Sequence, residues 1–194
     1  MFLRRLFGGE SAGSVNADPN AGSATASARP AAANGETETV RRIVASLEAM
    51  PPDEARYLAG FAYILGRAAA ADLDISAVET GAMEQIVMEH GGLNEAQAVI
   101  VVEIAKTQAR LRGGTEDFLV TREFRQLATE EERVALMRCC FIVAAGDSIS
   151  AGESAVLAEI ANELDLTADQ ITALRSEFTD HFAAVQAMRA QIGR

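Results

Sequence analysis

The sequence predicts an all-α fold, a compact bundle of about seven or eight helices built from two related helix-turn-helix units. From Thr39 onward, apolar residues at helical spacing alternate with glycine, proline and capping residues, and no segment makes a convincing strand. Aromatic residues make up only 5% of the chain and Trp is absent, so Ala, Leu, Ile, Val and Met must form a core of closely packed helices. A short acidic element occurs twice, each time between two helical segments, which indicates a duplicated unit.

Each expected helix has its own start or stop signal. Pro51-Pro52 ends the first helix, and the glycine pairs Gly91-Gly92 and Gly113-Gly114 end the third and fourth. The apolar run at 99–102 has strand propensity, but its flanks continue at helical period, so we expect a buried helix there. The expected helices cover residues 40–47, 53–71, 76–90, 94–111, 117–127, 129–145, 150–164 and 167–188.

The segment 134–145 is apolar almost all round, which places it at the centre of the bundle. Arg138 is the exception, and it needs a partner or a route to solvent. Cys139 and Cys140 are neighbours on this helix and point in different directions, so a bridge between them would be strained. We interpret them as small buried hydrophobic residues in a reduced cytosol.

Three regions follow one another along the chain. Residues 38–194 form the helical domain, and residues 8–37, rich in Ala, Gly and Ser, form a disordered linker that cannot bury enough apolar surface to order itself. Residues 1–7 form a short amphipathic element, in which Arg4 and Arg5 lie beside a stripe of apolar residues. This element could dock on anionic lipid or in a groove of a partner, or it could be a frayed terminus.

Composition excludes several classes of function. The net charge of −11 argues against a nucleic-acid surface, which needs clustered Lys and Arg. No apolar run approaches the length of a transmembrane helix, and no secretory signal is present, so we expect a cytoplasmic protein. The two histidines, His90 and His181, are isolated, and the sequence has no phosphate loop, zinc-type spacing or nucleophile elbow. We therefore expect no enzymatic activity.

The repeated acidic element supplies the candidate site. Its copies, 72–79 and 147–153, share the pattern Ile-Ser-x-x-Glu. Clustered carboxylates on a turn suit a hard cation such as Ca²⁺, although an EF-hand is excluded because Ala77 and Met83 occupy its glycine and final glutamate positions. The alternative is a capping box, in which the serine and glutamate side chains bind backbone N–H groups at the helix start. The candidate metal ligands are Asp72, Asp74, Glu79, Asp147 and Glu153.

This repeated pattern resembles that of the TerB family of tellurite-resistance proteins and of the related N-terminal domain of the membrane co-chaperone DjlA. The resemblance covers roughly residues 40–190. Leu73 replaces a glycine of the family pattern in the first copy, and Gly146 and Asp147 are exchanged in order in the second copy, which weakens an inherited ligand role there. The resemblance implies a compact helical bundle with an acidic surface, a role in stress responses, and binding of a divalent cation. The His-Pro-Asp tripeptide of a J-domain is absent, so a co-chaperone role is unsupported.

Two functions remain open at this point. The first is a non-enzymatic stress-response and interaction module that binds a divalent cation at its acidic turns and contacts an unidentified protein partner. The alternative is a membrane-peripheral adaptor that uses residues 1–7 as an anchor and the bundle to recruit a partner.

Overall fold

The computed structural model describes residues 32–69, 77–109, 117–146 and 148–192, and the chain divides into an N-terminal unit, Met1–Met50, and a C-terminal unit, Pro51–Arg194. The described part of the N-terminal unit is one helix, α2 (Ala32–Glu48). The predicted boundary at residue 38 falls inside this helix, and the predicted element at 1–7 lies outside the described residues. The C-terminal unit contains α3 (Pro52–Ala69), α4 (Ala77–Gly91), α5 (Glu95–Ala109), α6 (Asp117–Leu127), α7 (Glu130–Ala144), α8 (Ala151–Glu163), α9 (Ala168–Glu177), the short 3₁₀-helix η1 (Thr179–His181) and α10 (Ala183–Ile192).

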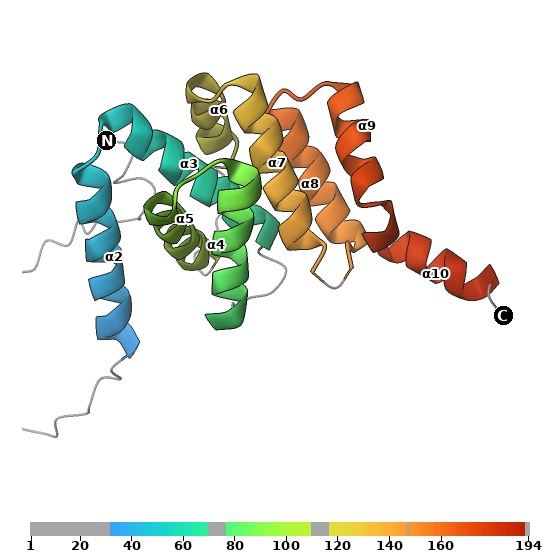
Figure 1. The fold of residues 1–194 in the computed structure, drawn as a ribbon, viewed down its shortest axis with the longest axis horizontal. Helices are drawn as coiled ribbons and strands as arrows, with labels where there is room; N and C mark the ends of the chain where they lie inside the picture. The colour runs from blue at the N-terminus through green and yellow to red at the C-terminus, as the bar shows by residue number, and fades with distance from the viewer. Residues whose placement is uncertain (1–31, 70–76, 110–116, 147, 193–194) are drawn as a thin grey trace, which may run out of the picture. The chain divides into compact units, whose positions relative to one another are not determined.

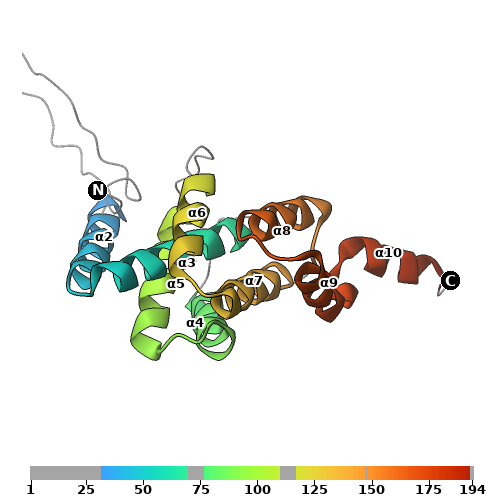
Figure 2. The ribbon, with the colours of Figure 1, turned by 90° about the horizontal axis from the view of Figure 1, so that it is seen from above.

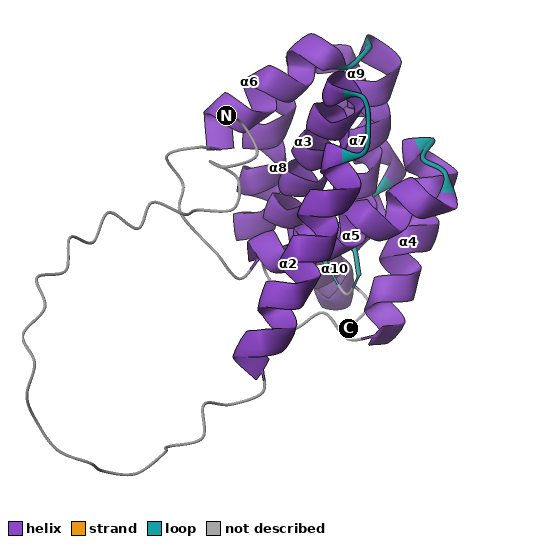
Figure 3. Ribbon diagram, turned by 90° about the vertical axis from the view of Figure 1, so that its left-hand side faces the viewer, coloured by secondary structure: helices purple, strands orange, loops and turns teal. Residues whose placement is uncertain are grey.

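The all-α prediction is confirmed for the described residues, in which helices are joined by short loops and no strand is formed (Figure 3). The apolar run at 99–102 lies within α5, as its flanks predicted. The one extended pairing among these residues is an isolated bridge between Ile149 and Phe182. No helix in the described part is both long and apolar enough to cross a bilayer.

Two helices, α3 and α7, form the centre of the C-terminal unit. α3 contacts α5, α6, α7 and α8, whereas α7 contacts α3, α4, α8 and α9 (Figures 1 and 2). The predicted central position of 134–145 is therefore confirmed, and α3 shares it. Gly66 lets α3 approach α5 closely, because a Cβ at this position would lie 3.1 Å from the backbone oxygen of Ala105.

Arg138, Cys139 and Cys140 of the central helix α7 have the environments that the sequence predicts. Arg138 reaches the surface, where its Nε and Nη2 atoms donate to the two carboxylate oxygens of Glu177 at 3.1 and 2.9 Å. Cys139 and Cys140 are buried free thiols. Burial raises the pKa of the Cys139 thiol to about 12, so this side chain behaves as an apolar residue at neutral pH.

The last predicted helix, 167–188, is wrong as a single element. The structure ends α9 at Glu177 and starts α10 at Ala183, with η1 between them. The Phe178 ring stacks on Phe141 with centroids 5.3 Å apart, and Phe182 is held extended by the bridge to Ile149. Because these tertiary contacts stabilise a break, the chain turns and α10 extends away from the rest of the C-terminal unit (Figures 1 and 2).

Candidate functional site

The two acidic elements lead into equivalent helix starts. Glu79 is the third residue of α4, and Glu153 is the third residue of α8. The first element follows α3 and the second follows α7, so the structure contains two pairs of consecutive helices, which we call the first repeat (α3–α4) and the second repeat (α7–α8). Asp72, Asp74 and Asp147 lie outside the described residues, as does the side chain of Glu79.

Glu153 takes part in a capping box. Its Oε2 accepts the backbone N–H of Ser150 at 2.7 Å, while its own N–H donates to the Ser150 hydroxyl at 3.2 Å. The capping interpretation is therefore confirmed for the second copy. The cap is compatible with metal ligation by Glu153, because a carboxylate has about four lone-pair positions and the cap uses one of them.

The backbone just before this cap is anchored in the core. Ile149 is only 2% exposed, and its N–H donates to the carbonyl of His181 at 2.7 Å. The N–H of Ala183 in turn donates to the Ile149 carbonyl at 3.0 Å. The isoleucine of the repeated motif thus buries its side chain while the serine beside it starts the helix.

The helices of the two repeats pack in a reciprocal pattern. α3 contacts α8 and α7 contacts α4, so the first helix of each repeat packs on the second helix of the other. α3 and α7 also contact each other. Exchanging the repeats maps one of these contacts onto the other, whereas within the described parts of the repeats only α7 and α8 are among the helix pairs that pack closely.

Metal ligation at the acidic elements stays a prediction. Among the residues whose side chains are described, no three His, Cys, Asp or Glu side chains gather in a metal-binding cluster. Of the five candidate ligands only the side chain of Glu153 belongs to that set.

An ion-pair network ties α3, α6 and α8 together two residues before α3 ends. The Arg67 side chain is 10% exposed and lies 2.6 Å from Glu163 and 3.5 Å from Asp117. It also donates to the Thr121 hydroxyl at 3.1 Å, and the Tyr63 hydroxyl donates to Asp117 at 2.6 Å. Burial by itself lowers the pKa of Arg67. The hydrogen bond to Glu163 and the charges of Glu163 and Asp117 raise it by more than burial lowers it, so the pKa lies above its ordinary value and the guanidinium is charged.

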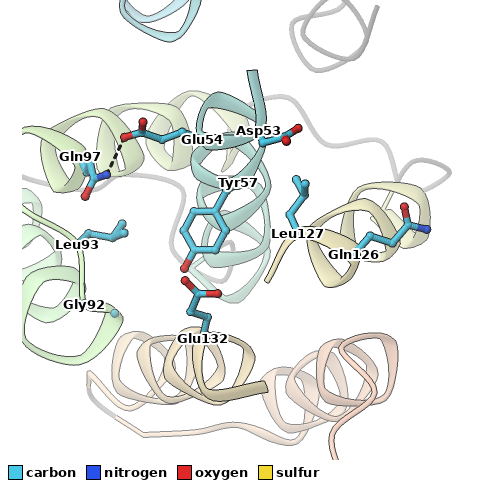
Figure 4. A pocket seen from close by; sticks show the side chains of 10 residues that line it. Asp53, Glu54, Tyr57, Gly92, Leu93, Gln97, Gln126, Leu127 and Glu132 are labelled. Carbon is cyan, nitrogen blue, oxygen red and sulfur yellow. Dashed lines mark hydrogen bonds between the residues drawn. The ribbon is translucent and has the colours of Figure 1, made fainter. Parts of the chain in front are cut away.

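A pocket of about 570 Å³ opens where α3 and α7 begin, at the opposite end of these helices from the acidic elements. Its walls come from the first turns of α3, the α4–α5 connection, the end of α6 and the first turn of α7 (Figure 4). The residues that give it chemical character are Asp53, Glu54, Tyr57, Leu93, Leu127 and Glu132.

Tyr57 is the central aromatic residue of this pocket. Its ring packs against Phe124 and Phe61, with centroids 5.1 and 6.2 Å away, and its hydroxyl points toward the Glu132 carboxylate (Figure 4). Burial, reinforced by the negative charge of Glu132, raises the pKa of Tyr57, so the hydroxyl stays protonated at neutral pH. The pocket therefore presents a neutral phenol beside carboxylates.

Sequence reasoning did not identify this pocket. Asp53, Gln97 and Glu132 fall within the first turns of the helices that the sequence predicts to begin at residues 53, 94 and 129. Gln97 forms a reciprocal cap with Asn94, and Glu132 forms one with Thr129, so both residues also start their helices. The pocket brings together three stretches of the chain, residues 53–57, 91–97 and 126–132, and no local pattern signals that arrangement.

Comparison with known proteins gives one match. The family model described as tellurite resistance protein TerB matches residues 58–176, which is more than half of the chain and includes both acidic elements. Neither a curated protein nor a solved structure matches the chain. The resemblance carried by the repeated Ile-Ser-x-x-Glu pattern is thus confirmed by a match that runs from α3 to α9. The chain belongs to the TerB family of tellurite resistance proteins.

Proposed function

We propose that this chain is a non-enzymatic stress-response interaction module of the TerB family, which binds a divalent cation, Ca²⁺ or similar, at its acidic helix-start turns. The observation that supports the proposal most directly is the shared register of the two repeats. A glutamate is the third residue of both α4 and α8, within the segment that matches the family. Asp72, Asp74 and Glu79 form the stronger site, and Asp147 and Glu153 form the weaker one.

The reciprocal packing of the repeats supplies a mechanism. Each acidic element joins the two helices of one repeat, and those helices pack on the helices of the other repeat. A cation that neutralises the carboxylates of an element lowers the repulsion between them and changes how the helix pair is held. The consequence is a change in the surface that the bundle presents to a protein partner.

Thermal unfolding of the full chain tests the cation site. The protein is treated with EDTA and then unfolded alone and with Ca²⁺, Mg²⁺ or Mn²⁺. A ligand at 100 times its dissociation constant adds about 2.7 kcal/mol to the free energy of unfolding. For a domain of this size that gain raises the melting temperature by about 5–11 °C.

Two variants locate the effect. Asp72→Asn/Glu79→Gln should abolish most of the shift, and Asp147→Asn/Glu153→Gln should reduce it by a smaller amount. The matched control is Glu95→Gln/Glu131→Gln, which removes two charges from exposed first-turn positions of α5 and α7 and should keep the full shift. A shift retained by the first variant, or no shift with any ion, would overturn the proposal.

A further inference from the structure

The pocket beside Tyr57 has a chemical character of its own, distinct from the acidic turns. Tyr57 supplies an aromatic ring and a hydroxyl, while Leu93 and Leu127 supply apolar walls (Figure 4). Its volume of about 570 Å³ falls in the range of sites that enclose a small ligand or a few side chains. An aromatic floor between apolar walls suits the stem of a long side chain better than a small hydrated ion.

The carboxylates at the rim determine which sign of charge a ligand of this pocket carries. Glu54 and Glu132 accept hydrogen bonds from neutral groups, namely the Gln97 side-chain amide at 3.0 Å and the Thr129 backbone N–H at 2.7 Å. Asp53, by contrast, pairs with Arg56 at 3.0 Å. Among the described residues neither glutamate pairs with a cation, so a cation placed between them would find both charge attraction and the aromatic surface of Tyr57.

We propose that this pocket binds an arginine side chain from a basic segment of a partner protein, with the guanidinium between Glu54 and Glu132 and against the Tyr57 ring. Arginine fits because its planar guanidinium stacks on aromatic rings and offers five donors, while its aliphatic stem packs on the leucines. The net charge of −11 also attracts a basic segment toward the bundle. The inference rests on the interaction role proposed above but not on the cation site.

Fluorescence anisotropy with the full chain tests this pocket. The probe is a fluorescein-labelled Leu-Arg-Leu-Arg-Leu amide, measured in EDTA so that failure of the divalent-cation proposal does not affect the result. The comparison peptide carries citrulline in place of arginine, which keeps the shape and removes the charge. We expect saturable binding of the arginine peptide and at least about threefold weaker binding of the citrulline peptide.

The variants Glu54→Gln and Glu132→Gln should each raise the dissociation constant about threefold to tenfold. Glutamine preserves the cap at position 132, because Gln170 makes the same contact with Thr167 in α9. The matched control is Asp169→Asn, which removes one charge from an exposed first-turn position of α9, outside the pocket. Its affinity should be unchanged.

Three results would overturn the inference. These are no saturable binding of the arginine peptide, equal binding of the citrulline peptide, or an equal loss of affinity in Asp169→Asn, which would indicate unspecific charge attraction. If Glu132→Gln failed to fold by circular dichroism, Glu54→Gln would decide, since its side chain is partly exposed and outside any cap. In ¹H–¹⁵N spectra, the amides of Gly91 and Gly92 should move on peptide addition, and that of Ala151 should not.

Discussion

Replacing Arg67 with methionine removes a buried cation that joins three helices. The Arg67 and Glu163 side chains are 10% and 11% exposed, and their charged groups lie 2.6 Å apart. Removing one partner of a buried ion pair leaves the other charge without compensation, which costs about 3–5 kcal/mol. Methionine recovers part of the lost packing, so we expect the free energy of unfolding to fall by about 3 kcal/mol. The melting temperature should then fall by about 6–12 °C.

Urea unfolding followed by circular dichroism measures this loss, and Arg138→Met is the matched control. Arg138 also binds a glutamate through two hydrogen bonds, but the side chains of this pair are 34% and 43% exposed. Exposed pairs contribute about 0–1 kcal/mol, so the control should lose no more than that. Adding Glu163→Met to Arg67→Met should restore part of the stability, because the uncompensated carboxylate is removed.

The reasoning would be refuted if Arg67→Met cost no more than Arg138→Met. It would also be refuted if Glu163→Met destabilised the Arg67→Met protein further, because the remaining carboxylate would then not be the source of the loss.

Two more predictions concern close packing and pH. In urea unfolding, Gly66→Ala should lower the free energy of unfolding by about 1–3 kcal/mol, because the new Cβ meets the backbone of Ala105. Gly81→Ala should raise the free energy of unfolding by about 0.5–1 kcal/mol, because the space around Gly81 is open and alanine favours the helix. The hydrogen bond from Arg138 lowers the pKa of Glu177 below its ordinary value of 4.5. Slight burial opposes this effect, whereas the electrostatic interactions with Arg138 and His90 add to it. This pair therefore stabilises the fold above that value, and the contribution is lost as the pH falls through the lowered pKa. A ¹³C titration of the Glu177 carboxyl group should show a lower midpoint in the wild-type protein than in Arg138→Met. Equal midpoints would show that Arg138 is not the cause of the lowered pKa.

Helix starts were predictable because capping is local. A capping box needs only a serine, threonine or asparagine and a glutamate or glutamine three residues later, and the caps at Asn94, Thr129, Ser150 and Thr167 all form as that spacing predicts. The same locality explains why the run at 99–102 could be assigned to a helix from its flanks. The duplicated acidic element was visible for the same reason, since its residues are consecutive.

The break between α9 and α10 could not be predicted in this way. Nothing in the local sequence from Phe178 to Phe182 forbids a continuous helix. The interruption depends on Phe141 and Ile149, which lie more than thirty residues earlier in the chain. A contact between distant residues can outweigh local helix propensity, because propensity differs by less than about 1 kcal/mol per residue.

The sequence by itself determined the fold class, the starts and caps of most helices, the apolar central segment and the family. The starts, the caps and the apolar segment depend on neighbours within one or two helical turns, and the family is visible because each copy of its motif is a run of consecutive residues. Only the tertiary structure decided where Arg67 finds its carboxylates, 96 residues away in the case of Glu163, and how three separate stretches of the chain form the pocket at Tyr57. The physical reason is that helix periodicity identifies which face of a helix is buried, whereas the partner of that face depends on how all the helices pack at once.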